Sequence, residues 1–367
     1  MTAFNRKIRV LVVDDSSLVR DLLKEILSSA PDIEVIGEAA NGLEAIEKVI
    51  ALQPDIVTMD IEMPVMGGME AIERIMAQNP LPILVVTAMT GIRTAFTAVS
   101  KGALDLIEKP DVCLENMKLL ISKIRLLAQV DIREHRGMAR QHQQKIVTKA
   151  AGHSSPQAVG KIVAMAASVG GPQAISSILA ALPASFPVPI IITQHITEGF
   201  TQGMVEWLNS GTPLTVKIVQ DGAVLAPGLV YVNPAEHTLR ISEQGVFQLG
   251  ERDRSRPYNP SCDTMLVSVA TAFHKHAIGL ILSGMGHDGL VGMQAIRAHG
   301  GASLAQDEAS SMIYGMNQVA INHGCIDQVL PLAAIPAELL RRVSEPLPLE
   351  SSPAATNLCR TAAAWTP

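Results

Sequence analysis

The chain has 367 residues, a formal net charge of −6 at pH 7, and 48% hydrophobic against 17% charged residues. This apolar content supports buried cores and excludes wholesale disorder, and the length predicts two domains or one large one. The acidic balance and an aromatic content of 3% argue against nucleic-acid binding, which needs a basic face or stacking platforms. No apolar run approaches ~18 residues, so the sequence predicts no membrane insertion.

The spacing of the cysteines and the N-terminal residues indicate the cellular compartment of the protein. The four cysteines are widely spaced and form neither a CxxC pair nor a metal-binding pattern: Cys113, Cys262, Cys325 and Cys359. This usage predicts a reduced, cytoplasmic protein with buried free thiols. Met1 to Arg9 lead directly into a strand-like run without the apolar region of a signal peptide.

Strand-like and helix-like segments alternate through residues 1–129. The runs rich in Val, Ile and Leu are Ile8–Val13, Ile33–Gly37, Ile56–Met59, Ile83–Thr87 and Leu104–Ile107. Between them the apolar spacing is helical, as in Leu18, Leu22, Leu23, Ile26 and Leu27. Repeated strand–helix units predict a (βα)5 domain with a doubly wound parallel sheet, and the continuously apolar strands agree with burial on both faces.

The rest of the chain divides into three segments. Residues 130–160 are polar and Gln-rich, which predicts a linker. Strand–helix alternation resumes over residues 161–343 and predicts a second doubly wound α/β domain. Residues 344–367 are rich in Pro, Ser and Ala, which is typical of a disordered tail.

Three apolar runs of the second domain read as buried strands: Ile162–Ala167, Ile190–Gln194 and Ala277–Leu282. Two further runs, Val230–Val232 and Thr238–Ile241, are separated by the turn-like NPAEH. They predict an antiparallel hairpin with each other.

Charged and hydroxyl side chains follow the strands of the first domain: Asp14, Asp15, Asp60, Thr87 and Lys109. The carboxyl ends of parallel strands meet at one edge of such a sheet, where ligands bind. Three convergent carboxylates are costly without a cation, and oxygen ligands select a hard ion such as Mg²⁺. A carboxylate beside a metal ion, a lysine and a threonine can attack a phosphoryl donor. The alternative, that these are helix caps and exposed turn acids, fits one such residue better than five.

This set resembles the response-regulator receiver domain over residues 5–128. The motifs are VVDDS at 12–16, TMDIEMPVMGG at 58–68, Thr87-Ala88 and Lys109-Pro110. The resemblance implies that Asp60 is the phosphoacceptor, that Thr87 and Lys109 serve the switch, and that the peptide before Pro110 is cis. It also implies Mg²⁺ ligands, which are Asp14, Asp15, Asp60 and the backbone carbonyl of Glu62.

One position departs from the receiver pattern. Leu106 stands where such domains usually carry a Tyr or Phe that rotates with the threonine. The resemblance therefore implies a phosphorylation switch that works without the usual aromatic rotation.

Ser168 lies between the first strand of the second domain and a helix-like segment. Gly170 and Gly171 allow a tight turn, and Pro172 suits a first helical position. A serine on such a turn is exposed, with backbone N–H groups nearby to stabilise negative charge, as in a nucleophile elbow, although the sequence is not G-x-S-x-G. The alternative is that Ser168 is an N-cap.

Two more candidates follow strands of the second domain. His195 ends the run IIITQH, and Asp288 lies in the glycine-rich LSGMGHDGL after another strand. Together with Ser168 they predict a triad of nucleophile, base and orienting carboxylate, in an order that matches none of the three familiar ones. The alternatives are a turn histidine and an N-cap of the helix Leu290–His299; His237, in the predicted hairpin turn, is a weaker candidate.

Residues 160–333 resemble the catalytic domain of the chemotaxis protein-glutamate methylesterase/glutaminase (CheB) family. The motifs are AASVGGPQAI at 166–175, QHITEGFTQGM at 194–204, PGLVYVNPAEHTL at 227–239, RPYNPSCDTML at 256–266, GLILSGMGHDG at 279–289 and AQDEASSMIYGMN at 305–317. The resemblance implies Ser168 as nucleophile, His195 as base, Asp288 as orienting group and the Met285 backbone N–H as part of the oxyanion hole. It implies hydrolysis of glutamyl methyl esters and deamidation of glutamines on methyl-accepting chemotaxis receptors, without a cofactor in the hydrolase domain.

A receiver fused upstream of this domain is the architecture of the family, which implies regulation. A chemotaxis histidine kinase would phosphorylate Asp60, and the unphosphorylated receiver would obstruct the second domain. Three departures are Val169 for Thr, Ala166 for Gly and Asn317 for Pro; loss of the Thr hydroxyl predicts slower chemistry or a repacked site. Two alternatives stay open, a phosphorylation-switched binding module and an esterase for a non-chemotaxis receptor.

Overall fold

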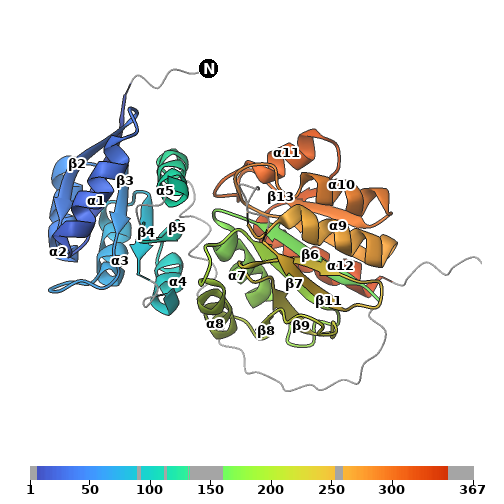
Figure 1. Ribbon diagram of the computed structural model, residues 1–367. Helices are drawn as coiled ribbons and strands as arrows, with labels where there is room; N and C mark the ends of the chain where they lie inside the picture. The colour runs from blue at the N-terminus through green and yellow to red at the C-terminus, as the bar shows by residue number, and fades with distance from the viewer. Residues whose placement is uncertain are drawn as a thin grey trace, which may run out of the picture.

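A computed structural model describes residues 6–88, 92–110, 114–130, 132, 160–252 and 259–345 of the chain (Figure 1). The first domain alternates strands and helices in the order β1 (Ile8–Val13), α1 (Ser17–Ser28), β2 (Ile33–Ala39), α2 (Gly42–Leu52), β3 (Ile56–Met59), α3 (Gly68–Gln78), β4 (Ile83–Thr87), α4 (Ile92–Ser100), β5 (Asp105–Glu108) and α5 (Leu114–Leu127). The strands form one parallel sheet in the order β2-β1-β3-β4-β5. The predicted (βα)5 doubly wound domain is therefore confirmed.

The second domain is built on a larger parallel sheet. Its elements are β6 (Ile162–Ala167), α7 (Gly171–Ala181), β7 (Ile190–Gln194), α8 (Thr201–Gly211), β8 (Thr215–Ile218), β9 (Leu229–Val232), β10 (His237–Ile241), β11 (Phe247–Glu251), α9 (Cys262–Phe273), β12 (Ala277–Ile281), α10 (Leu290–Ala298), β13 (Ala302–Gln306), α11 (Met316–Asn322), β14 (Gln328–Leu330) and α12 (Ile335–Ser344). Seven strands pair in the order β14-β13-β12-β6-β7-β9-β8, all parallel. This confirms the second α/β doubly wound domain.

The predicted hairpin between residues 230–232 and 238–241 is wrong. β9 pairs in parallel with β7 and β8, whereas β10 forms an antiparallel hairpin with β11. The burial patterns give the reason. β9 is almost continuously buried and so suits a sheet covered on both faces, whereas β10 alternates between buried and exposed residues.

Alternate residues of each strand face different cores. In β6, Val163, Met165 and Ala167 pack toward α7, α8 and α12, and the intervening residues pack toward α9, α10 and α11. Figure 1 shows α7 and α8 on one side of this sheet and α9 and α10 on the other. The receiver sheet is covered by α1 and α5 on one face and by α2, α3 and α4 on the other. Both sheets are thus covered on their two faces, and the polar candidate residues lie just after the carboxyl ends of their strands.

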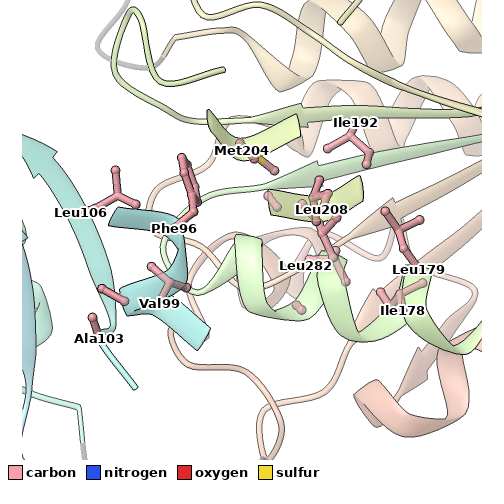
Figure 2. Close-up of a cluster of buried hydrophobic side chains, with 14 of the residues drawn as sticks. Phe96, Val99, Ala103, Leu106, Ile178, Leu179, Ile192, Met204, Leu208 and Leu282 are labelled. Atoms are coloured by element: carbon pink, nitrogen blue, oxygen red, sulfur yellow. The ribbon is translucent and has the colours of Figure 1, made fainter. Parts of the chain in front are cut away.

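One apolar cluster joins the two domains. Phe96, Val99 and Leu106 of the receiver belong to the same buried cluster as residues of α7 and α8 (Figure 2). The ring of Phe96 stacks on Trp207 of α8 with centroids 5.8 Å apart, and Gln173 Nε2 of α7 donates to the Ala103 carbonyl at 3.0 Å. The α4–β5 face of the receiver is therefore packed against the second domain.

Several smaller predictions are settled by the structure. The peptide between Lys109 and Pro110 is not cis, since the one cis bond among the described residues precedes Pro260; a trans bond is the ordinary preference before proline. Cys262 and Cys325 are buried free thiols, as predicted, and the other two cysteines lie outside the described residues.

Most of the predicted linker and tail also lies outside the described residues, so the predicted domain boundaries stay predictions. Within the described part of the chain, no helix combines the length and apolarity needed to cross a bilayer.

Val65 is a strained residue in the loop that follows Asp60. It has φ 67° and is 84% exposed, so no packing compensates a left-handed conformation that β-branched residues avoid. We expect Val65→Asn to raise stability by roughly 1 kcal/mol, because asparagine tolerates this conformation. Thermal unfolding measures it, with Val224→Asn, at an exposed valine of negative φ, as the control. Equal or lower stability of the Val65 variant would contradict the assignment of strain.

Candidate active site and phosphorylation site

Ser168 lies on the predicted turn between β6 and α7, but it is only 8% exposed, so the expectation of an exposed serine is wrong for this packing of the two domains. Its backbone N–H donates to the Ser283 carbonyl at 3.0 Å, and its carbonyl accepts from Gly171 N at 2.8 Å and Gln194 Nε2 at 2.7 Å. The N-cap of α7 is Gly170, with φ 78° and no side-chain cap bond. The alternative role of Ser168 as an N-cap is therefore wrong, and its hydroxyl is left for other chemistry.

His195 follows the neighbouring strand β7. Its backbone N–H donates to Ala167, the residue before Ser168, at 3.0 Å, so the two side chains leave adjacent strand ends of one edge. The His195 ring bonds to the Asp288 carboxylate, Nε2 to Oδ2, at 2.8 Å, and both side chains are about nine-tenths buried. The predicted edge thus brings the histidine and the aspartate into contact.

Asp288 is held by the first turn of α9. Its Oδ2 accepts from Cys262 N at 2.7 Å and its Oδ1 from Asp263 N at 2.9 Å. Burial alone would raise the pKa of Asp288, but the hydrogen bonds from His195 and from these two amides outweigh it and lower the pKa. The N-cap of α10 is Gly289, so Asp288 does not have the alternative role of capping its own helix.

The glycine-rich loop before Asp288 packs directly on Ser168. A Cβ built on Gly284 would lie 2.7 Å from Ser168 Cβ, so only glycine allows this approach. Met285 follows with its side chain 38% exposed, and within the described part of the chain its N–H makes no hydrogen bond. The free amide therefore belongs to the residue after Gly284, which packs on Ser168; its use as an oxyanion donor stays a prediction.

His237, the weaker candidate, lies on the exposed β10–β11 hairpin, where its Nδ1 is 3.3 Å from the Gly250 carbonyl. It is outside the sheet edge that carries Ser168. The residues missed at that edge are Ser261, Cys262 and Asp263, which surround Asp288. Their one signal in the sequence is the motif RPYNPSCDTML, which by itself assigns no role to any of the three.

The receiver edge brings its acidic residues together as predicted. Carboxylate oxygens of Asp14, Asp15 and Asp60 lie within 4.8 Å of one another, and Lys109 Nζ is 2.8 Å from both Asp14 and Asp60. Burial raises the pKa of Asp60, and the hydrogen bond from Lys109 offsets this only in part. Thr87 is buried at the end of β4, on the strand beside β5, which leads to Lys109.

The receiver cluster fits Mg²⁺. Three carboxylates, two of them buried, supply the hard oxygen donors and the negative charge that this ion prefers. Asp14, Asp15 and Asp60 would hold the ion, which would neutralise charge where a phosphoryl group arrives. Glu62 follows in the loop after Asp60 with its side chain exposed, and its carbonyl as a ligand stays a prediction.

The two sheets and their edges define the class of protein. A parallel five-stranded sheet with converging aspartates and a lysine is that of a receiver domain, and it is joined to a seven-stranded α/β domain with Ser168, His195 and Asp288 at one edge. The chain is therefore a response regulator with an α/β output domain.

Comparison with known proteins agrees with this class and narrows it. The family model "Response regulator receiver domain" matches residues 10–121, and "CheB methylesterase" matches residues 163–339. The chain is 42% identical over 91% of its length to a protein-glutamate methylesterase/protein-glutamine glutaminase of Paramagnetospirillum magneticum, of which 96% is covered. The corresponding protein of Thermotoga maritima is 38% identical, with 92% of this chain and 99% of that protein covered. The solved catalytic domain of Thermotoga maritima CheB is similar to 50% of this chain and 98% of its own, at 35% identity and a TM-score of 0.49. The chain belongs to the CheB family of protein-glutamate methylesterases.

Proposed function

We propose that the chain is a phosphorylation-regulated serine hydrolase. It hydrolyses glutamate methyl esters on methyl-accepting chemotaxis receptors, releasing methanol, and deamidates receptor glutamines to glutamate. The observation that carries this proposal is the 2.8 Å contact between His195 and Asp288 beside the Ser168 turn, in a chain that belongs to this family. The reaction takes place in the cytoplasm, where the methylated receptor helices lie.

The hydrogen bond between His195 and Asp288 assigns the chemical roles of the side chains. His195 Nε2 faces Asp288, so Nδ1 is the ring nitrogen that takes the proton of the Ser168 hydroxyl. Asp288 fixes the ring tautomer and stabilises its charged form. The lowered pKa of Asp288 keeps this carboxylate ionised at neutral pH.

The proposed reaction balances in two steps. Ser168 Oγ attacks the ester carbonyl carbon and its proton goes to His195, after which the tetrahedral intermediate expels the alkoxide, which takes that proton and leaves as methanol. Water then attacks the acyl-serine by the same route and releases glutamate. The Met285 N–H stabilises the oxyanion in both steps, and with glutamine the leaving group is ammonia.

The receiver controls access to this edge. Gln173 lies in the first turn of α7, the helix that begins just after Ser168, and donates to Ala103 of the receiver. A histidine kinase phosphorylates Asp60, and the added charge shifts the population from this closed packing toward an open form. A change from 1:99 to 99:1 needs about 5.5 kcal/mol of discrimination, so partial activation is expected.

Asp60→Asn is expected to abolish activation by a small phosphoryl donor while basal hydrolysis persists, because the amide cannot accept the phosphoryl group. Methanol release with and without donor and Mg²⁺ measures this. Asp21→Asn, which removes an exposed acid of α1, is the matched control and should respond as the wild type does. Persistent activation of the Asp60 variant would assign the phosphoacceptor elsewhere.

The function itself is tested by the products. Methanol release from methylated receptor membranes and ammonia release from unmodified receptor glutamines should both occur with the wild-type chain. A folded protein that is phosphorylated on Asp60 yet releases neither product would leave a receiver-controlled binding module. Release of alcohol from other esters but not from receptors would instead indicate an esterase of a different pathway.

A further inference from the structure

The N-termini of α9 and α10 lie against each other, and each receives a carboxylate from the other helix. Asp288, just before α10, accepts from Cys262 N and Asp263 N in the first turn of α9. Asp263, in that turn, accepts from Gly289 N at 2.9 Å and Gly292 N at 2.8 Å at the start of α10. The two helices therefore cap each other through a reciprocal pair of aspartates.

This arrangement replaces an ordinary cap. The N-cap position of α10 is Gly289, with φ 116° and no side chain to accept a hydrogen bond, so the amides there need an acceptor from elsewhere. Asp263 supplies it with one oxygen, Oδ1, shared by two N–H groups. Negative charge is favoured at both helix N-termini, which offsets the repulsion between two neighbouring carboxylates.

Helices α9 and α10 approach closely enough to fix their positions relative to each other. A Cβ on Gly292 would lie 2.3 Å from Leu266 Cβ, so the backbone of α10 rests directly on α9. Ser261, the N-cap of α9, also donates its hydroxyl to Asp288 Oδ1 at 3.3 Å. Asp263 thus fixes the residue that follows Asp288, while the backbone around Asp263 holds the Asp288 carboxylate.

We propose that Asp263 is a positioning residue for hydrolysis: by anchoring Gly289 and Gly292 it holds Asp288 in line with His195 Nε2. This inference rests on the proposed function of Ser168, His195 and Asp288. Asp263 touches neither the substrate nor the reacting atoms. Its effect reaches the reaction through the 2.8 Å contact between Asp288 and His195, whose misalignment is expected to slow the proton transfer while substrate binding is unchanged.

Asp263→Ala in the full-length chain is expected to lower kcat for methanol release roughly 10- to 100-fold, with KM changed less than about twofold. Asp263→Asn keeps an oxygen acceptor for the two amides and should restore most of the activity. Asp263→Ser, a smaller disturbance, should fall between them and serves if the alanine variant does not fold. The low-field proton NMR signal of the His195–Asp288 hydrogen bond gives a second readout, which should weaken in Asp263→Ala and persist in Asp263→Asn.

Asp327→Ala provides the matched control. Asp327 Oδ2 also accepts two hydrogen bonds, from Ser303 N at 2.8 Å and from the Ser303 hydroxyl at 2.9 Å, but these lie near the amino end of strand β13. Its loss should lower the melting temperature while kcat and the NMR signal stay at wild-type values. An Asp263→Ala variant that behaves in the same way would overturn the proposal. A wild type that releases no methanol would contradict the proposed function alone, because the NMR signal would still report on Asp263.

Discussion

Ser168→Ala is expected to reduce methanol release by roughly 10³-fold or more, the usual effect of removing a nucleophile from a triad. The fold should be unaffected, because the turn is held by the Ser168 backbone through Ser283 and Gly171, and alanine keeps both hydrogen bonds. Methanol release, with thermal unfolding to verify the fold, measures this.

The matched control is Ser210→Ala, which removes an exposed serine hydroxyl that bonds only to its own helix. It should retain wild-type activity. Phosphorylation of Asp60 should also be unchanged in the Ser168 variant, since its acceptor lies in the other domain. Substantial methanol release by a folded Ser168→Ala protein would remove the serine from the mechanism.

Removing residues 1–150 is expected to raise basal methanol release about 10-fold or more, because the receiver then no longer covers α7 and α8. The close packing of the receiver on α7 and α8 predicts a large rise in the basal rate of methanol release. Phe96 is 1% exposed and stacks on Trp207, and Ala103 accepts from Gln173 next to the Ser168 turn. Initial rates of the fragment and the full chain, at equal concentrations of folded protein, measure it.

A variant of the full-length chain distinguishes loss of the interdomain contact from other consequences of the truncation. Phe96→Ala removes the stacked ring but keeps both domains, so its basal rate should rise in the same direction by a smaller factor. Leu81→Ala, at a partly buried leucine outside α4, serves as the control for loss of apolar contact within the receiver. Unchanged or lower activity in a folded fragment would contradict inhibition by the receiver.

The strands were the most predictable part of the fold. β1, β3, β4, β6 and β7 have the bounds expected from the sequence, because a strand buried on both faces is continuously apolar. Which strands pair with each other was less predictable. The segment that forms β9 has the length and composition of a hairpin strand. The residues around it do not indicate that it pairs with β7, which lies well before it in the sequence.

The candidate site was predictable where it depends on strand ends, since parallel topology brings Ser168 and His195 to one edge. The hydrogen bonds of Asp263 to Gly289 and Gly292 were not predictable, because they depend on how α9 approaches α10. Contact between the receiver and the second domain was predicted, but the residues that form it were not. Leu106, noted as a departure from the receiver pattern, is 5% exposed within the interdomain cluster, so an aliphatic side chain there serves packing (Figure 2).

Val169 is a second departure from a family pattern whose side chain packs in an apolar cluster. It is 6% exposed and belongs to an apolar cluster that includes Leu104 and Ile107 of the receiver and Met312 and Ile313 of the loop before α11. A valine at this position therefore adds apolar contact where a threonine would present a hydroxyl. Slower chemistry than in relatives with threonine stays a prediction.

The central claim is that one chain couples phosphorylation of Asp60 to serine-dependent ester hydrolysis. The most direct measurement is methanol release from methylated chemoreceptor membranes by the wild type and by Ser168→Ala, each with and without Mg²⁺ and a small phosphoryl donor. We expect release by the wild type that rises with the donor, and none above background from the variant under either condition. Release that is independent of Ser168, or no release from a folded and phosphorylated wild type, would contradict it.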